Sequence, residues 1–275
     1  MATGVVRSFG TGALAARAAL AWIRIDPRAG ELDRINFRGR TVSLAGGPAL
    51  VAGATIGAAF GASGPAVAAA AVTAGAASGA VGLYDDLVGN RPEQKAKGFA
   101  GHLGALREGR VTSGLVKIAG VGAAALAASA LLPAGRRRRG TVDVLLGAGV
   151  IAGTANLLNL LDLRPGRALK AGALIGAPLA LGRGGGVAAG TLGAGAALLK
   201  SDLGEEIMLG DAGANALGAL LGVALAARTG PAGRAVALAM LAGLTVASEK
   251  VSFTKVIQDT PWLRTLDELG RRPPA

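Results

Sequence analysis

A long stretch without any charged side chain, residues 41–84, most constrains what this chain can fold into. Residues 61–65, Gly-Ala-Ser-Gly-Pro, divide it into two apolar blocks. Each block is close to the ~20 mostly apolar residues that a helix needs to cross a bilayer. A water-soluble helix would carry polar residues at every third or fourth position, and these blocks do not. The stretch therefore predicts two membrane-spanning helices.

The composition extends this interpretation to the whole chain. Of 275 residues, 51% are hydrophobic and only 17% are charged, whereas soluble domains carry ~25% charged residues. The 46 glycines would weaken helices in water, but lipid requires every backbone amide to be paired internally, so helix remains the default. Small residues also let helices approach closely. We expect an all-α, polytopic transmembrane bundle of about nine spans, with residues 1–275 as a single integral membrane domain. The expected spans cover residues 5–24, 43–62, 65–83, 113–132, 142–161, 169–182, 185–199, 213–228 and 235–249.

Lysine and arginine predict the orientation of the bundle. Most of them lie in loops that face the cytoplasm if the N-terminus is outside, which favours an N-out/C-in protein of the plasma membrane. The four arginines at 136–139 fall in an outer loop and disagree with this orientation. The net charge of +12 is then explained by loops that face anionic membrane lipid, and we expect no nucleic-acid partner. Residues 250–275 are predicted to form a cytoplasmic tail with an amphipathic helix, at 251–269, on the membrane surface.

Carboxylates gather at the predicted cytoplasmic ends of three different spans. Asp85 and Asp86 end the third span, Asp162 ends the fifth, and Asp211 precedes the eighth. Charge at membrane depth is costly and is usually functional. Converging carboxylates suit Mg²⁺, which proteins hold through one or two carboxylates together with substrate phosphates. The alternative is that carboxylates at helix ends are simply solvated. The absence of cysteine excludes disulfides and thiolate metal sites.

Four polar segments adjoin these spans in a recognisable order. They are residues 36–47, Gly-Leu-Tyr-Asp-Asp at 82–86, Asn-Leu-Leu-Asn-Leu-Leu-Asp at 156–162, and Leu-Gly-Asp-Ala-Gly at 209–213. In this order and spacing, the series resembles the polyprenyl-phosphate N-acetylhexosamine-1-phosphate transferase family, which includes the phospho-MurNAc-pentapeptide translocase. The resemblance covers roughly residues 30–250.

The resemblance implies a site and a reaction. The reaction would be Mg²⁺-dependent transfer of a sugar-1-phosphate from a UDP-sugar to a polyprenyl phosphate such as undecaprenyl phosphate, with release of UMP, in cell-envelope glycan assembly. Such phosphoryl transfer depends mostly on positioning and charge neutralisation. A homodimer is an open alternative for the assembly. The implied catalytic residues are Asp85, Asp86, Asp162 and Lys97, the implied metal ligands are Asp86 and Asp211, and Asn156, Asn159 and Lys95 are implied in substrate binding.

Further basic residues have two interpretations each. Arg164 and Arg167 directly follow Asp162, and they are either a phosphate clamp or anchors that obey the positive-inside rule. Lys117 lies one turn inside its span, where it either snorkels to the interface or reaches the diphosphate. His102, the only histidine, is either a donor to a phosphate or a loop residue on the membrane surface.

Parts of the family pattern are changed in this chain. The position of a second aspartate after Asp162 holds Pro165, residues 248–255 contain no histidine, and Ala214 stands where the family has serine. These changes leave open a second hypothesis, a non-catalytic scaffold or lipid-phosphate-binding protein of an envelope-assembly complex. A transporter or another lipid-phosphate enzyme is a third alternative, although the chain has neither an Asp-Gly-x-x-Ala-Arg segment nor the inverted symmetry of transporters.

Overall fold

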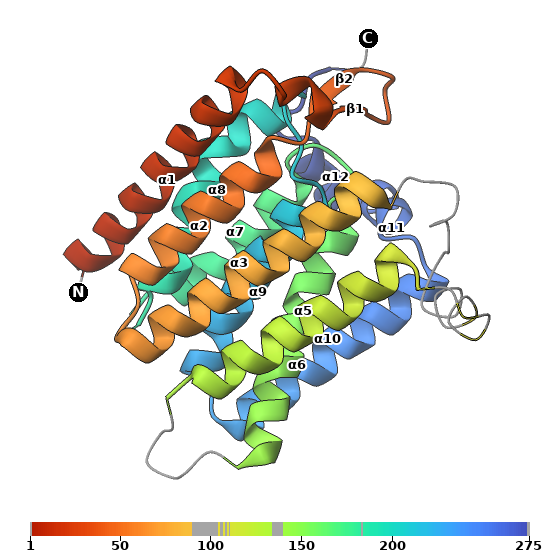
Figure 1. Cartoon of the computed structure of the whole chain (residues 1–275). Helices are drawn as coiled ribbons and strands as arrows, with labels where there is room; N and C mark the ends of the chain where they lie inside the picture. Colours follow the sequence, from red (N-terminus) through yellow and green to blue (C-terminus); the bar gives the residue numbers. More distant parts are fainter. Residues whose placement is uncertain are drawn as a thin grey trace.

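The described part of the chain is a helical bundle with one small β-hairpin at one end (Figure 1). The computed structural model describes residues 2–89, 104, 107, 109, 111–133, 140–182 and 184–273. A short 3-10 helix, η1 (Ala29–Leu32), leads into the hairpin of β1 (Asp33–Ile35) and β2 (Thr41–Ser43). The long helices are α1 (Ala2–Ile25), α2 (Gly46–Phe60), α3 (Pro65–Val88), α5 (Ser113–Leu131), α6 (Thr141–Leu161), α7 (Arg167–Ala180), α8 (Gly186–Leu203), α9 (Gly210–Arg228) and α10 (Pro231–Lys250). Each of the nine expected spans coincides with one of these helices.

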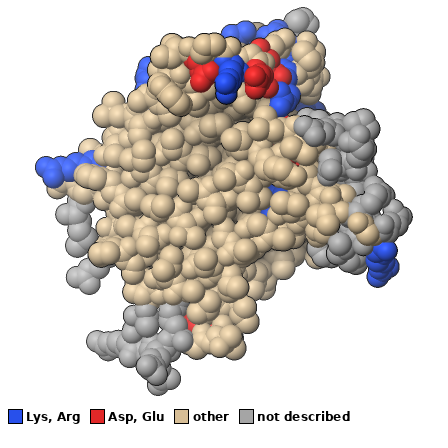
Figure 2. Space-filling model, in the orientation of Figure 1, with Lys and Arg blue, Asp and Glu red and all other residues tan. Residues whose placement is uncertain are grey.

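The chain is a helical membrane protein by the length and composition of its helices. Within the described residues, five helices are long and apolar enough to cross a membrane, namely α3, α5, α6, α9 and α10, and α2 is a shorter apolar helix. Figure 2 shows charged side chains gathered at the hairpin end of the visible face, while its middle is nearly free of them. Such an uncharged belt is what contact with hydrocarbon requires.

Helix α9 forms the centre of the bundle. It is the most buried of the five apolar helices and packs against α2, α3, α6 and α8. Glycine makes the closest approaches possible, because a Cβ at Gly82 would overlap the carbonyl oxygen of Asp211, and one at Gly218 would overlap that of Thr154. Small residues therefore let helix backbones touch, as the composition predicted. In contrast, α10 is largely exposed along its length.

The helices alternate in direction, so α3, α6 and α8 end where α5, α7 and α9 begin (Figure 1). The hairpin lies at this end, which we call the hairpin end (Figure 1). Its strands pair antiparallel with Arg34 opposite Val42, and Ser43 forms a parallel bridge to Ile207 just before α9. Arg34 also donates a 3.2 Å hydrogen bond to the carbonyl oxygen of Asp86 in α3. The sequence did not predict this hairpin, because strands of three residues are too short to show a period of two.

The C-terminal tail differs from its prediction. Instead of one amphipathic helix over residues 251–269, it forms two short helices, α11 (Phe253–Asp259) and α12 (Pro261–Glu268). Pro261 has no N–H to continue a helix, and it disfavours helical geometry at the preceding Thr260, which is extended at φ −104° and ψ 108°. The tail also packs against the bundle instead of lying only on the membrane surface, since Asp267 of α12 is buried.

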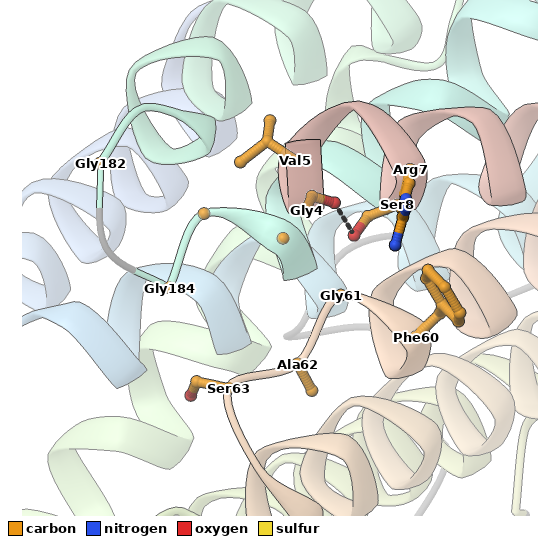
Figure 3. A pocket seen from close by; sticks show the side chains of 12 residues that line it. Gly4, Val5, Arg7, Ser8, Phe60, Gly61, Ala62, Ser63, Gly182 and Gly184 are labelled. Carbon is orange, nitrogen blue, oxygen red and sulfur yellow. Dashed lines mark hydrogen bonds between the residues drawn. The ribbon is translucent and has the colours of Figure 1, made fainter. Parts of the chain in front are cut away.

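The end of the bundle opposite the hairpin contains a cavity of about 330 Å³ (Figure 3). The start of α1, the α2–α3 connection and the glycine-rich connection before α8 surround it. Arg7 lines it, and Ser8 beside Arg7 donates its hydroxyl to the carbonyl of Gly4. None of the predicted site residues lines this cavity.

Candidate functional site

A lysine between two aspartates forms the centre of a polar cluster at the hairpin end. The Nζ atom of Lys117, in α5, lies 2.7 Å from Oδ2 of Asp85, in the last turns of α3. It also lies 2.7 Å from Oδ2 of Asp211, in the first turn of α9. One ammonium is therefore shared by two carboxylates from helices that are far apart in sequence. The structure shows Lys117 paired with two aspartates, and its predicted contact with the diphosphate stays a prediction.

Asp86 joins α3 to the start of α9. Its Oδ1 accepts a 2.9 Å hydrogen bond from the backbone N–H of Asp211, and its Oδ2 accepts one of 2.9 Å from that of Ala212. The first N–H groups of a helix have no partner within the helix, and the helix dipole favours a negative charge there. The carboxylate of Asp86 thus caps α9 from a neighbouring helix, and this fixes the position of Asp211.

Gly210 makes this cap possible. Its φ of +59° is in the left-handed region, which glycine adopts without steric cost. A Cβ at this position would lie 2.7 Å from Oδ1 of Asp86. The positive φ and the close approach of Asp86 therefore explain why glycine precedes Asp211, which the sequence pattern alone does not.

The Asn-x-x-Asn-x-x-Asp segment is divided between two environments. Asn159 donates from Nδ2 to Oδ1 of Asp211, and so belongs to the cluster. Asn156 points to α10, where it donates to the hydroxyl of Thr245 at 3.1 Å. The structure thus brings one of the two asparagines to Asp211 and not the other.

Asp162 lies just beyond the end of α6 and faces other carboxylates. Its pKa is raised well above the usual range, first by burial and then by the negative charges of Asp202, Asp211 and Asp86, against which the backbone N–H of Gly210 acts. A carboxyl in this environment favours a proton or a nearby cation.

The oxygen donors of the cluster fit a hard cation that is shared with another ligand. Among the described residues, no three His, Cys, Asp or Glu side chains form a group that could hold a metal ion. Asp85 and Asp211, however, direct one oxygen each at a single cationic atom, the Nζ of Lys117. Proteins hold a Mg²⁺ that also binds phosphates through one or two carboxylates. Asp85 and Asp211 are therefore the residues of this cluster that could hold such an ion.

A second cavity, of about 330 Å³, lies between the hairpin and the α6–α7 connection. Phe37 forms one wall, and the guanidinium of Arg164 lies over its ring, 4.2 Å from the centroid. Acidic side chains of Asp162, Asp202 and Glu205 also line the cavity. Sequence reasoning did not assign roles to Phe37, Asp202 or Glu205, although Phe37 is part of the polar segment at 36–47.

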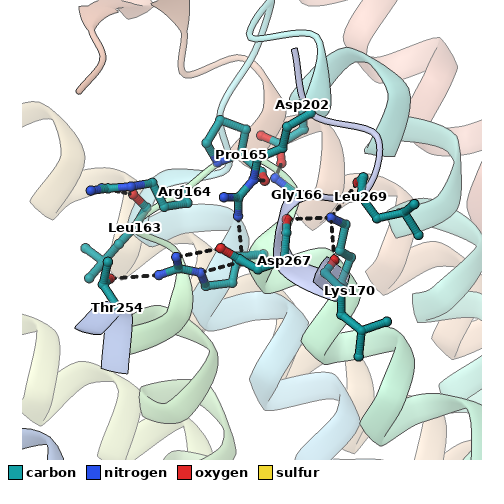
Figure 4. A network of polar contacts seen from close by, with 12 residues as sticks. Leu163, Arg164, Pro165, Gly166, Lys170, Asp202, Thr254, Asp267 and Leu269 are labelled. Carbon is teal, nitrogen blue, oxygen red and sulfur yellow. Dashed lines mark hydrogen bonds and ion pairs between the residues drawn. The ribbon is translucent and has the colours of Figure 1, made fainter. Parts of the chain in front are cut away.

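Arg164 and Arg167, predicted together as a phosphate clamp, have different surroundings. Arg164 lines the cavity. Arg167 is buried and directs Nε and one terminal nitrogen at the two carboxylate oxygens of Asp267, at 2.8 and 2.9 Å (Figure 4). The clamp prediction stays a prediction for Arg164, whereas Arg167 binds the tail.

The structure does not describe the predicted basic residues that follow the aspartate pair. Lys95, Lys97 and His102 lie outside the described residues, as do the arginines at 136–139. Their predicted roles in catalysis and phosphate binding stay predictions.

The fold and the cluster define a class: a helical membrane protein with an aspartate–lysine–asparagine site at one end of its bundle. No protein-family model matches the chain, and no curated protein matches it either. The resemblance found in the polar segments therefore rests on the residues of the chain itself.

Proposed function

We propose that the protein is a phosphoglycosyl transferase, which moves a sugar-1-phosphate from a UDP-sugar to a polyprenyl phosphate with the help of Mg²⁺. One observation carries the proposal. Asp85, Asp86, Asn159 and Asp211, from three of the motifs that resemble the transferase family, meet in one cluster with Lys117. A passive bundle has no need to gather charge at the ends of three apolar helices.

In the proposed reaction, a phosphate oxygen of the lipid attacks the β-phosphorus of the UDP-sugar. The bond between this phosphorus and the oxygen that bridges to the α-phosphate breaks, and UMP leaves with the bridging oxygen. Bound Mg²⁺ would neutralise the charge of the diphosphate. We assign it to Asp85 and Asp211 rather than to the implied pair of Asp86 and Asp211, because both oxygens of Asp86 accept backbone amides at the start of α9. Lys117 is placed to share these carboxylates and to donate to phosphate oxygens.

The other polar residues of the cluster position these groups. Asn159 orients Asp211 by donating to its second oxygen. Asp86 holds the start of α9 in place through two backbone amides. Asp162, whose pKa is raised by burial and by neighbouring carboxylates, is suited to hold a proton and to donate it in a hydrogen bond to a phosphate oxygen.

We assign the nucleotide of the donor to the cavity beside the hairpin. The guanidiniums of Arg164 and Arg38 lie over the ring of Phe37, 4.2 and 5.3 Å from its centroid, and guanidinium groups are donors for the phosphate oxygens of a nucleotide. Asp162 lines this cavity and is also close enough to Asp211 and Asp86 for their charges to raise its pKa.

We further propose nine spans in an N-out/C-in orientation in the plasma membrane, so that the hairpin end faces the cytoplasm. The nine long helices of the described part alternate in direction, and the carboxylates of the cluster all lie at the hairpin end. Nucleotide sugars are cytoplasmic, so the site must open to that side. The biological process would be assembly of a cell-envelope glycan.

The test is UMP release by the purified protein with Mg²⁺, undecaprenyl phosphate and a panel of UDP-sugars. We expect release that needs the metal and the lipid, and that falls about 10²-fold or more in Asp85→Asn, a loss typical of removing one group that stabilises developing charge. Asp259→Asn in the exposed tail makes the same chemical change away from the cluster and should keep the activity. Folded protein that releases no UMP from any donor would refute the proposal.

A non-catalytic lipid-phosphate-binding protein is the second candidate. The observation that favours it is that the carboxylates already have internal partners, the ammonium of Lys117 and the amides of α9. This candidate predicts that the protein binds polyprenyl phosphate with the same affinity in the presence and absence of UDP-sugars, and that it releases no UMP.

A further inference from the structure

The tail is fastened to the bundle by a buried ion pair. Arg167 and Asp267 are 4% and 8% exposed, and they form a two-pronged contact between the start of α7 and the end of α12. The remaining terminal nitrogen of Arg167 donates to the hydroxyl of Thr254 in α11 at 2.9 Å. Planar fork-to-fork pairs of this kind are strong and geometrically specific. Both tail helices are therefore attached to the same arginine (Figure 4).

Two more cations extend this attachment. Nζ of Lys170 donates to the carbonyl oxygens of Leu266, Asp267 and Leu269, at 3.0, 2.8 and 2.7 Å, and so binds the unpaired carbonyls at the end of α12. Arg271 donates to Oδ1 of Asp267 at 2.6 Å and to the carbonyl oxygen of Pro165 at 2.8 Å. The tail thus contacts the backbone of the α6–α7 connection directly.

That connection is a wall of the cavity at the hairpin end. Leu163, Arg164 and Pro165 line the cavity, and the next residue, Gly166, is held from the other side by Oδ2 of Asp202 at 2.6 Å. The position of Arg164 over Phe37 therefore depends on a loop that is fixed at both sides, by α8 and by the tail.

The opposite face of the tail is apolar and exposed. Trp262 is 65% exposed, and Val256, Leu266 and Leu269 are exposed as well. The tail follows immediately after α10, a candidate membrane span whose own apolar side chains are largely exposed. Tryptophan favours the boundary between lipid headgroups and hydrocarbon, and short amphipathic helices lie at that boundary. The apolar face thus continues from a lipid-facing helix, and the occupant that fits it is the membrane interface.

We propose that α11 and α12, which we call the strap, bind on two sides. The side with Trp262 lies in the lipid interface, and the other side positions residues 163–166 through Asp267 and Arg271. Asp267 and Arg271 are then positioning residues for Arg164 and for the cavity wall. The inference goes beyond the transferase proposal, since it concerns attachment and lipid contact and requires no reaction.

The lipid contact is tested by fluorescence. The chain has two tryptophans, so Trp22→Phe leaves Trp262 as the single emitter. The protein is reconstituted in phosphatidylglycerol–phosphatidylethanolamine vesicles whose acyl chains carry bromine near the headgroup or near the bilayer centre. We expect the shallow bromine to quench Trp262 at least twofold more than the deep one. Emission that neither bromine quenches would overturn the lipid assignment and leave a water-exposed or protein-covered face.

The attachment is tested by cysteine labelling, which the cysteine-free chain permits without background. Ala168→Cys places a thiol in the buried first turn of α7, next to Arg167. We expect Asp267→Asn to raise its labelling rate about tenfold, Asp267→Glu to restore part of the protection, and the matched Asp259→Asn to change nothing.

A second buried thiol, far from the strap, distinguishes local release of the tail from unfolding of the whole protein. Ala128→Cys in α5 should label equally slowly in the parent and in Asp267→Asn. If Asp267→Asn leaves the thiol of Ala168→Cys as protected as before, or exposes both thiols alike, the tail does not position the loop. Neither result depends on UMP release, so failure of the strap and failure of the transferase proposal are distinguishable.

Discussion

Replacing Lys117 by methionine should destabilise the protein, and divalent metal should reverse the loss. Methionine keeps the length and apolar stem of lysine but removes the charge. The ammonium lies 2.7 Å from one oxygen of Asp85 and 2.7 Å from one oxygen of Asp211. Without it, these oxygens face each other at no more than twice that distance.

The magnitude follows from the geometry. Two unit charges about 5 Å apart repel by roughly 3 kcal/mol at an effective dielectric constant of ~20. Breaking a fully buried ion pair by removing one partner costs roughly 3–5 kcal/mol. The side chains here are 23%, 11% and 25% exposed for Lys117, Asp85 and Asp211, so water screens part of the effect. We expect Lys117→Met to lower the free energy of unfolding by about 3 kcal/mol.

The rescue by metal has a calculable size. A ligand that binds only the folded state stabilises it by ~2.7 kcal/mol at a hundred times its Kd. Mg²⁺ at such a concentration should thus restore most of the stability of Lys117→Met. The parent should gain less, because its ammonium competes for the same two oxygens. Unfolding is followed by circular dichroism during titration of detergent-solubilised protein with sodium dodecyl sulfate, at several Mg²⁺ concentrations.

Two further variants separate this explanation from general damage. Lys250→Met removes the same charge at the exposed end of α10 and should stay within ~0.5 kcal/mol of the parent. The double variant Lys117→Met/Asp85→Asn removes the repulsion and should be more stable than Lys117→Met alone. The reasoning is refuted if Lys117→Met is as stable as the parent without metal, or if Mg²⁺ stabilises both to the same extent.

Three other perturbations test the cluster and the strap. Gly210→Ala should lower the free energy of unfolding by about 1–3 kcal/mol, because residue 210 has a φ of +59° and its Cβ would lie 2.7 Å from Asp86. The control Gly243→Ala, where a Cβ in α10 meets open space, should be neutral or slightly stabilising in the same titration. Asn159→Ala should reduce UMP release, because Asp211 loses its orienting donor, while Asn156→Ala should leave it nearly unchanged. Burial raises the pKa of Asp267, but hydrogen bonds from Arg167 and Arg271 outweigh this effect, so the pKa is lowered. The attachment of the tail is therefore complete above pH ~4 and is lost as the pH falls through the lowered pKa. A spin label on the exposed face of α12 should report this loss as increased mobility.

The positions of the helices were predictable because lipid leaves few alternatives. An apolar stretch of sufficient length must pair its backbone internally, so all nine expected spans coincide with helices. The convergence of Asp85 and Asp211 was predictable for a related reason. Charged residues at the ends of apolar segments collect at the membrane boundary, and alternation in helix direction brings the last turn of α3 and the first turn of α9 to the same side.

What could not be predicted are contacts that no local pattern encodes. Arg167 and Asp267 are 100 residues apart, and a buried pair of opposite charge looks in sequence like two ordinary residues of a loop and a tail. The cap of α9 comes from Asp86 in another helix, so no residue before α9 indicates it. The role of Lys117 was open for the same reason, because snorkelling and pairing place lysine at the same depth in a span.

The aspartates at the hairpin end differ in which groups compensate their negative charge. Asp85 and Asp211 share an ammonium, Asp86 accepts two amides of a helix N-terminus, and Asp267 has an arginine on each side. Asp162 differs, because burial and three neighbouring carboxylates raise its pKa while a single amide acts against them. Folding therefore favours its protonated form, or a cation beside it. The aspartates with fixed partners hold the architecture, whereas Asp162, which lines the cavity, lies in surroundings that favour a proton or a cation.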